Sequence, residues 1–433
     1  MTDESVRGSL RAEVRAWLDE HWTAGRELPR TPWLAQVVDA RWAVPTWPTT
    51  WYGRDLDGET AEAVAEEFRR VGAPGAAQDR HNLWANTVLA FGTESLKRQF
   101  VRRLLIDDVK MCLLYSEPGA GSDLAGLQTR ADRDGDEWVV NGQKVWTSSG
   151  KEAEYGMLVA RTNWDVPKHN GISFFWCPMR QPGVEVRPIR QITGESHFNE
   201  VFLDDVRIPG DHLVGPLDGG WRVLQTALAY ERSVMGDVAR GPRSDSPHGR
   251  ESADSHDVRA AGDSSGDDRT TRPGADAGSP APVRQGAEVD LWALARERGR
   301  DQDPAIRQAV ARVHTLRMVN RWNGLRAKSQ LEQGSSSPIL SLGKLAMSRI
   351  LHEGAHVQRL IVGQEAQLYG KDHPLGDDAN FLSLNAFFTS IGGGTDQIQR
   401  NIIGERVLGL PREPEVDRNV PFKDVAKATV HRT

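Results

Sequence analysis

The stretch that decides the fold reads Tyr115-Ser116-Glu117-Pro118-Gly119-Ala120-Gly121-Ser122-Asp123. It follows a short apolar run, residues 111–114, which we interpret as the end of a buried helix. Pro118 and the two glycines predict a tight loop, and glycine has no Cβ to keep a phosphate or a ring edge away from the backbone N–H groups. The loop lacks both the Gly-Lys-Ser/Thr ending of a phosphate loop and the G-x-G-x-x-G pattern of a dinucleotide fold. Alone, it indicates either a ligand loop or a glycine-rich connector.

The residues after the loop predict a pair of strands. Residues 127–131 and 137–140 are the candidate strands, and Asp134-Gly135-Asp136 joins them. The second strand reaches Asn141-Gly142, the dipeptide best suited to a tight hairpin turn, so we expect a turn there. The segment that follows reads Lys144-Val145-Trp146-Thr147-Ser148-Ser149-Gly150. A second glycine-rich segment, near the C-terminus, reads Ile391-Gly392-Gly393-Gly394-Thr395-Asp396-Gln397.

Residues 116–161 resemble the flavin-binding segment of acyl-CoA dehydrogenases, and residues 391–406 resemble the closing motif of that family. The two segments occur in the family order at nearly the family separation, and the resemblance covers most of the chain apart from one insert. It implies an α+β fold with an N-terminal α-helical domain at 1–115, a middle β-barrel or sandwich domain at 116–218 and a C-terminal α-helical bundle at 219–433.

The resemblance also implies which side chains meet the ligands. By motif position, contacts with an FAD cofactor are expected from Leu113, Tyr115, Ser116, Gly121, Ser122, Trp146, Ser148, Thr395 and Gln397. Contacts with an acyl-CoA substrate are expected from Ser122, Tyr230, Arg232 and Gly394. Trp146 would lie along the isoalloxazine ring, with Ser148 near its N5. The alternative for Trp146 is a place in the core of the β-barrel.

The residue that removes the α-proton of the substrate is a separate question. In many family members a glutamate precedes the Gly-Thr of the closing motif, but here that position is Gly393. A helix beginning near residue 220 would place Glu231 in the middle of an apolar face formed by Leu224, Ala227, Leu228 and Met235. A carboxylate on such a face costs free energy unless it is paired or functional. Some family members carry the base on this helix directly before an arginine, and Glu231-Arg232 resembles that pattern. The alternative is a Glu–Arg pair at a subunit contact.

The resemblance implies an FAD-dependent α,β-dehydrogenation in which Glu231 would accept the α-proton and flavin N5 would accept the β-hydride. The expected partners are an acyl-CoA, an electron-transfer flavoprotein or equivalent acceptor, and further subunits in a homotetramer or a heterotetramer with a related chain. Apolar helices at residues 339–347 and 361–368 offer surface for that assembly.

Two alternatives stay open. One is a flavin acyl-CoA oxidase of the same fold. The other is a non-catalytic partner subunit of a heteromeric acyl-CoA dehydrogenase. The second rests on the insert at 241–286 and on the absence of the Arg-x-x-Phe-Gly stretch that contacts the flavin pyrophosphate in the family. The candidate substitutes for that stretch are Arg296, Arg298 and Arg300.

Composition is consistent with this class of enzyme. A chain of 433 residues predicts two or three domains. Its 54 basic and 60 acidic residues give a net charge of -6, which argues against electrostatic binding of nucleic acid. The only cysteines are Cys112 and Cys177, so neither a disulfide framework nor a zinc site is indicated, and we expect a reducing, cytoplasmic location. Neither a signal pattern nor an apolar run of membrane-spanning length is present.

Periodicity predicts the remaining elements. The N-terminal part should be mostly helical, with an apolar stripe of Leu10, Val14, Trp17 and Leu18 and further helices at 57–71 and 86–105. Further strands are expected at 156–161, 171–176, 184–188 and 199–203. C-terminal helices are expected at 289–298, 304–330, 338–362 and 382–389. Residues 241–286 carry too few apolar side chains to form a core and predict a disordered insert.

Overall fold

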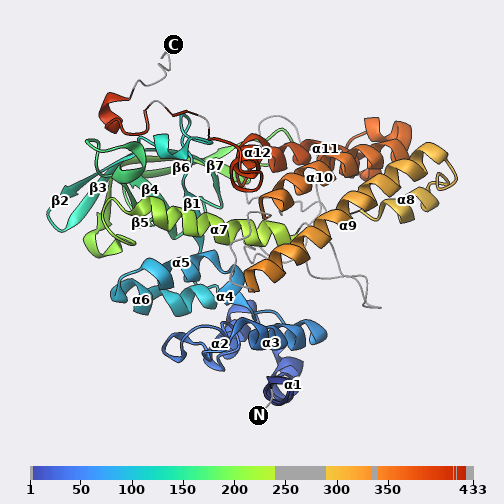
Figure 1. Cartoon of the computed structure of the whole chain (residues 1–433), viewed down its shortest axis with the longest axis horizontal. Helices are drawn as coiled ribbons and strands as arrows, with labels where there is room; N and C mark the ends of the chain where they lie inside the picture. Colours follow the sequence, from blue (N-terminus) through green and yellow to red (C-terminus); the bar gives the residue numbers. More distant parts are fainter. Residues whose placement is uncertain (1–2, 239–288, 333–339, 413, 416, 426–433) are drawn as a thin grey trace. The chain divides into compact units, whose positions relative to one another are not determined.

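The computed structural model describes residues 3–238, 289–332, 340–412, 414–415 and 417–425 (Figure 1). Contacts divide the chain into two compact units. The first comprises Met1–Arg187, Asn199–Ser233 and Glu415–Thr433, and the second comprises Pro188–Phe198 and Val234–Pro414. The insert predicted at 241–286 lies outside the described residues.

Six α-helices form the N-terminal part of the first unit. They are α1 (Asp3–Gly25), α2 (Arg30–Asp39), α3 (Gly58–Val71), α4 (Gln78–His81), α5 (Leu83–Phe91) and α6 (Glu94–Leu105), with the 3-10 turn η1 (Thr49–Trp51) between α2 and α3. The helix predicted from residue 57 is confirmed, and the Asp57 side chain caps it by accepting from two backbone N–H groups. The single helix predicted at 86–105 is wrong. The backbone is extended at Gly92, and the Thr93 side chain caps a new helix, α6.

Large apolar side chains build the core of this part. Trp33 and Trp42 are each 1% exposed and belong to one buried cluster with Leu10, Val14 and Leu18 of α1. The predicted apolar stripe of α1 is therefore a packing face. The tryptophans of this region contribute mainly large buried area.

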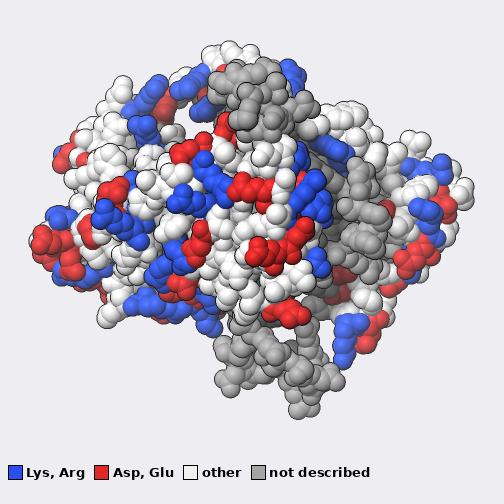
Figure 2. Space-filling model, turned by 90° about the horizontal axis from the view of Figure 1, so that it is seen from below, with Lys and Arg blue, Asp and Glu red and all other residues white. Residues whose placement is uncertain are grey.

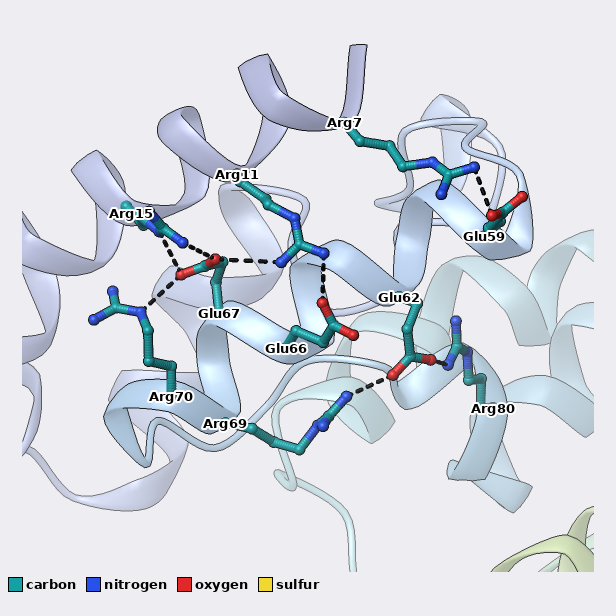
Figure 3. A network of polar contacts seen from close by, with 10 residues as sticks. All are labelled: Arg7, Arg11, Arg15, Glu59, Glu62, Glu66, Glu67, Arg69, Arg70 and Arg80. Atoms are coloured by element: carbon teal, nitrogen blue, oxygen red, sulfur yellow. Dashed lines mark hydrogen bonds and ion pairs between the residues drawn. The ribbon is translucent and has the colours of Figure 1, made fainter. Parts of the chain in front are cut away.

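Ion pairs join α1 to α3 (Figure 3). Glu67 accepts hydrogen bonds from Arg15 Nε at 2.7 Å and Nη2 at 2.8 Å, and from Arg70 Nε at 2.8 Å. The Glu67 side chain is 3% exposed. Hydrogen bonding to Arg15 lowers its pKa to about 2, although burial acts in the opposite direction. Arg11 donates to Glu66 on the same side of α3 at 2.5 Å. These charges hold the first helix of the chain on the third.

Seven strands form the middle part. They are β1 (Met111–Leu114), β2 (Arg130–Asp134), β3 (Glu137–Ser148), β4 (Tyr155–Arg161), β5 (Ile172–Pro178), β6 (Val184–Ile189) and β7 (Phe198–Pro209). They join in one sheet of order β1-β4-β2-β3-β7-β6, with β5 paired to β4. The four strands predicted after residue 155 are confirmed as β4 to β7, and the expectation of a β domain between helical parts is confirmed with them. The short 3-10 turns are η2 (Leu124–Gly126), η3 (Lys168–Gly171) and η4 (Gly210–His212).

Two local predictions in this part are wrong. Residues Met111–Leu114 form a strand parallel to β4 rather than a helix end, because four apolar residues are too few to show a period and pairing decides their structure. Asn141-Gly142 lies inside β3, and the hairpin turn is the Asp134–Glu137 connection, where Gly135 has a φ of +58°. Gly142 meets a different requirement, since a Cβ there would lie 2.8 Å from the Thr129 Cα.

Helices form most of the remaining structure. Helix α7 (Gly220–Val238) follows the sheet, and the second unit contains α8 (Leu291–Glu297), α9 (Pro304–Glu332), α10 (Leu340–Val362), η5 (Gly363–Gln367), α11 (Pro374–Ile391) and α12 (Asp396–Arg406). The C-terminal helices predicted from periodicity are confirmed, although α11 begins earlier than expected, with Pro374 in its first turn. The apolar helix expected at 361–368 is wrong, because α10 ends at Val362 and the 3-10 turn η5 follows. Helix α12 was not predicted. Within the described residues, no helix has the length and apolar character needed to cross a bilayer.

The surface carries charges of both signs. On the face shown in Figure 2, lysine and arginine side chains alternate with aspartate and glutamate in small groups. This mixture agrees with the near balance of 54 basic and 60 acidic residues.

Candidate functional site

Two backbone hydrogen bonds close the loop that follows β1. The Glu117 N–H donates to the Ala120 carbonyl at 3.0 Å, and the Ala120 N–H donates to the Glu117 carbonyl at 3.1 Å. A Cβ built on Gly119 or Gly121 would meet no described atom within 4 Å, and neither glycine has a positive φ. Packing and backbone conformation therefore leave both positions open to a larger residue. A ligand lying against the backbone would favour glycine there.

A buried ion pair holds this loop against β3. Lys144 Nζ donates to Glu117 Oε1 at 2.8 Å and to the Tyr115 carbonyl at 3.1 Å. The side-chain exposures are 0% for Lys144 and 8% for Glu117. Burial lowers the pKa of the Lys144 ammonium, and the Glu117 carboxylate opposes that effect. Burial alone would raise the pKa of Glu117, but the charge and hydrogen bond of Lys144 outweigh it and lower that pKa. The carboxylate also accepts from the N–H groups of Gln128 and Thr129, at 2.6 and 2.9 Å.

Arg161, at the end of β4, anchors the chain just beyond the loop. Its side chain is fully buried. The guanidinium donates to the carbonyls of Ala125 at 2.7 Å, Leu127 at 3.1 Å and Lys168 at 3.1 Å. Burial lowers the pKa of Arg161 to about 10, so it stays charged at neutral pH. Glu117 and Arg161 thus fix the two ends of the segment between β1 and β2.

The predicted site residues on β1 and the loop differ in exposure. Tyr115 is 7% exposed, and its ring meets Phe174 at 6.0 Å between centroids in an edge contact. Leu113 and Ser116 are half-buried, whereas Gly121 and Ser122 are exposed. Tyr115 therefore belongs to the core that supports the loop, and the other four lie at or near its surface.

Trp146 and Ser148 lie on the exposed face of β3. Trp146 is 58% exposed, and Thr147 between them is 1% exposed, as strand alternation requires. The alternative that placed Trp146 in the barrel core is therefore wrong. Its φ of +63° is uncommon for a residue other than glycine. The Val145 N–H donates to the Ser116 carbonyl at 2.9 Å, so this part of β3 and the loop form one connected surface.

Helix α7 carries the predicted base and two of the predicted substrate contacts. Leu224 and Ala227 are fully buried and Leu228 is half-buried, which confirms this part of the expected apolar face; the Met235 side chain lies outside the described residues. Tyr230 is half-buried; burial raises its pKa, and the negative charge of Asp79 adds to the effect. Glu231 and Arg232 lie within the helix, but their side chains are outside the described residues. Their roles stay predictions.

The closing motif lies in the second unit, between α11 and α12. Gly393 and Gly394 have φ values of +64° and +86°, a left-handed conformation that glycine adopts without strain. The Thr395 hydroxyl accepts from the Ile398 N–H at 3.2 Å and so caps α12. Asp396 accepts from Lys344 Nζ at 3.3 Å. Gly394, Thr395 and Gln397 therefore lie together on one loop and helix start, in a different unit from Trp146 and Ser148.

The chain matches the three domains of one known protein family. Three family descriptions match it: acyl-CoA dehydrogenase N-terminal domain at residues 1–107, middle domain at 112–206 and C-terminal domain at 277–408. The chain belongs to the acyl-CoA dehydrogenase family.

Several members of the family are similar along most of their length. Acyl-CoA dehydrogenase IpdE1 of Mycobacterium tuberculosis is 33% identical over 427 residues, which is 93% of this chain and 98% of that protein. The structure of the ChsE4-ChsE5 complex from Mycobacterium tuberculosis is 26% identical, with a TM-score of 0.60, and the match covers 95% of this chain and 99% of that one. A steroid ACAD, Tcur3481-Tcur3483, shares the fold with a TM-score of 0.67 at 24% identity, over 95% of this chain and 99% of that chain.

Membership in this family identifies the chain as an oxidoreductase and implies a flavin cofactor. The first unit offers features that fit a flavin: an exposed indole at Trp146, a hydroxyl at Ser148 on the same strand face, and an open glycine loop beside them. Among the described residues, no group of His, Cys, Asp and Glu is arranged to hold a metal ion.

The three arginines considered as substitutes for the missing flavin contact are engaged within the second unit. Arg298 pairs with Glu365 at 2.8 Å, and Arg300 pairs with Asp303 at 3.0 Å. Arg296 lies over the Trp292 ring at 5.8 Å from its centroid. All three have roles in the bundle, so a pyrophosphate contact from them would compete with these interactions.

Sequence reasoning missed the supports of the loop. The motifs that contain Glu117 and Lys144 were recognised, but the pairing of the two charges was not predicted. Alternation gave no signal for the pair, because Lys144 and Val145 are adjacent in β3 and both are buried. Arg161 and Lys168 carried no signal either, because most of their partners lie far along the chain.

Proposed function

We propose that this chain catalyses FAD-dependent α,β-dehydrogenation of an acyl-CoA thioester to the trans-2-enoyl-CoA, alone or with a related subunit. The observation that carries the proposal is the surface formed by the loop and β3. There, Trp146 and Ser148 face outward beside Gly121 and Ser122, and the buried Glu117–Lys144 pair holds the loop in place.

The residues of the chain would divide the work as follows. The flavin would be held on this unit by Leu113, Tyr115, Ser116, Gly121, Ser122, Trp146 and Ser148. Thr395 and Gln397 of the closing motif would reach the flavin of a neighbouring subunit, as the family resemblance implies. FAD, when bound, supplies a hydride acceptor at flavin N5. Glu231 would accept the α-proton, because a carboxylate in a dry site can act as a general base near neutral pH.

The α-carbon of a thioester is a weak acid, so the site must also assist the proton transfer. Hydrogen bonds to the thioester carbonyl stabilise the negative charge that develops there. Ser122, Tyr230, Arg232 and Gly394 would contact the acyl-CoA. Exclusion of water by the apolar face of α7, where Leu224 and Ala227 are buried, would strengthen these interactions.

The substrate we propose is a steroid-type acyl-CoA. Tcur3481-Tcur3483 is described as a steroid ACAD. A panel of CoA thioesters of increasing ring content, compared with straight-chain thioesters of equal carbon number, tests this choice. Equal or better turnover of the straight chains would reject it.

We propose a tetrameric assembly that includes a related subunit, with an electron-transfer flavoprotein or an equivalent acceptor as redox partner and the cytoplasm as location. Two of the similar structures are named with paired components, ChsE4-ChsE5 and Tcur3481-Tcur3483. The cytoplasmic location is supported by two buried free thiols, Cys112 and Cys177, because unpaired cysteines are typical of reducing compartments.

The experiment that tests the function is purification of the chain alone and together with a related chain, followed by absorbance spectroscopy and a dye-linked assay. Flavin absorbance with thioester-dependent dye reduction supports the proposal. Turnover that consumes oxygen without dye would indicate the oxidase alternative. A colourless chain that becomes a yellow, active complex when mixed with the related chain would indicate a shared site. Absence of flavin and of turnover in both preparations would reject the function.

A further inference from the structure

The C-terminal segment returns to the first unit and binds the sheet domain (Figure 1). The family match ends at residue 408, and we name residues 415 and 417–424 beyond it the C-terminal strap. The Phe422 N–H donates to the Val166 carbonyl at 2.9 Å, and the Lys423 N–H donates to the Trp164 carbonyl at 3.0 Å. An isolated antiparallel bridge pairs Pro421 with Pro167. The strap therefore joins the connection between β4 and β5 through this bridge and the start of a 3-10 turn, η6 (Phe422–Asp424).

Phe422 covers the guanidinium of Arg161. The Phe422 side chain is 4% exposed, and the Arg161 Cζ lies 3.5 Å from the centroid of its ring. The edges of the same guanidinium donate to the carbonyls of Ala125 and Leu127, directly after the glycine loop. An aromatic face over a desolvated cation is attractive and keeps water from the hydrogen bonds of that cation. Removing the ring would open those bonds to solvent.

Lys168 makes a second link between the strap and the loop. Its ammonium lies 2.9 Å from Oε1 of Glu415 in the strap. It also lies 3.2 Å from Oδ1 of Asp123, which is the last residue of the loop. The Lys168 side chain is 11% exposed, whereas Asp123 and Glu415 are 64% and 40% exposed, so the cation is shielded from water on one side of the bridge only. Burial alone would lower the pKa of Lys168, but the hydrogen bond to Glu415 and the negative charge of Asp123 outweigh it, so the pKa of Lys168 is raised.

We propose that the C-terminal strap is a positioning element that holds the loop of residues 116–123 in its flavin-binding shape, through Phe422 on Arg161 and Glu415 on Lys168. The part of this inference that concerns flavin rests on the proposed function. The strap would contribute to the flavin site without contacting the flavin. Arg161 and Lys168 transmit its effect, and both lie within residues that the middle-domain description matches.

The experiment compares three variants of the full-length protein, in whichever assembly binds FAD. Phe422→Ala removes the ring over Arg161, and Phe422→Tyr restores an aromatic face. Lys423→Ala is the matched control. Lys423 is next to Phe422 in the chain, and the substitution removes only its exposed ion pair with Asp165. Two quantities are measured for each: the FAD dissociation constant by flavin fluorescence, and hydrogen exchange in peptides that cover residues 116–128.

In Phe422→Ala we expect a roughly tenfold rise in the FAD dissociation constant and faster exchange across residues 116–128, with other core peptides unchanged. Phe422→Tyr and Lys423→Ala should stay within about twofold of wild type in both quantities. Unchanged exchange in the loop of Phe422→Ala would overturn the proposal, whether or not FAD binds. Faster exchange with unchanged FAD affinity would overturn the link to flavin and leave the proposed function intact. A wild-type protein without FAD would count against the proposed function, while the exchange data would still decide the link between strap and loop.

Discussion

Lys144 Nζ lies 2.8 Å from Glu117 Oε1, and both side chains are shielded from solvent at the point where the glycine loop meets β3. The ammonium also binds the Tyr115 carbonyl, so one buried cation joins the start of the loop to Glu117. A charged pair in this position costs desolvation energy, which its mutual attraction and added hydrogen bonds must offset. The desolvation energy of the Glu117–Lys144 pair is consistent with a role in fixing the shape of the loop rather than in maximising the stability of the fold.

Replacing one member of this pair should be strongly destabilising. Lys144→Met leaves the Glu117 carboxylate buried without its cation, and we expect a loss of about 3–5 kcal/mol in the free energy of unfolding, measured by urea denaturation. The matched control is Lys97→Met, which removes an exposed pair with Glu94 and should cost less than about 1 kcal/mol. Adding Glu117→Leu to Lys144→Met should recover part of the loss. Equal stabilities for Lys144→Met and Lys97→Met would contradict the account.

The acid stability of the N-terminal helices should depend on Glu67. Its pKa in the folded protein is lowered from 4.5 to about 2, so the charged carboxylate stabilises the fold above its ordinary pKa. That contribution is lost as the pH falls from about 4.5 towards 2. We expect it to be on the order of 1–2 kcal/mol, because solvent screens Arg15 and Arg70, whose side chains are about half exposed.

Thermal unfolding between pH 6 and pH 2 measures this contribution, because the pKa of Glu67 is lowered from 4.5 to about 2 in the folded protein. Wild type should lose stability steeply over the acid part of the range, and Glu67→Gln should lose less because it starts without the contribution. Glu66→Gln is the neighbouring control, since that side chain is 41% exposed and pairs with Arg11 alone in Figure 3. It should keep the wild-type slope. Parallel curves for wild type and Glu67→Gln would show that Glu67 does not carry the effect.

Much of the fold could be predicted because it depends on local signals. Periodicity predicted the helix at 57–71, the strands β4 to β7 had alternating or continuous apolar residues, and two motifs indicated the family. Predictions were wrong where a local signal was ambiguous. Residues Met111–Leu114 become a strand through pairing with β4. Gly142 does not form a turn; it is a glycine because Thr129 packs too closely to leave room for a Cβ.

The supports of the candidate site could not be predicted for a related reason. Arg161 and Phe422 meet at 3.5 Å although most of the second unit separates them in the sequence. Neither residue has neighbours that mark it as a partner of the other. The exposure of Trp146 could not be predicted from alternation either. Lys144 and Val145 are both buried, so the burial phase of β3 changes just before Trp146, whose φ is +63°.

The glycine loop offers a way to separate folding from ligand binding. At Gly121 the backbone has no positive φ and a Cβ meets no described atom within 4 Å. Gly121→Ala should therefore leave the melting temperature unchanged or slightly higher, while the FAD dissociation constant rises about tenfold because the methyl group occupies space proposed for the ligand. Gly135→Ala is the opposite control. Gly135 has a φ of +58°, which an alanine adopts only with strain, so this substitution should lower the free energy of unfolding by about 1 kcal/mol and leave FAD affinity unchanged. Normal FAD affinity in Gly121→Ala would move the flavin away from this loop.

The last prediction concerns the base. Glu231→Gln keeps the size of the side chain but removes its capacity to accept a proton, so flavin absorbance and thioester binding should persist while the rate of flavin reduction falls by at least about a thousandfold. Single-turnover bleaching of the flavin after mixing with the thioester measures that step directly. Gln225→Ala, at an exposed position on the same helix, controls for disturbance of α7 and should reduce the rate less than about threefold. A Glu231→Gln protein that reduces its flavin at a near-normal rate would exclude Glu231 as the proton acceptor. The carboxylate would then have to come from another part of the site or from a related subunit, since Gly393 offers none at the position that many family members use.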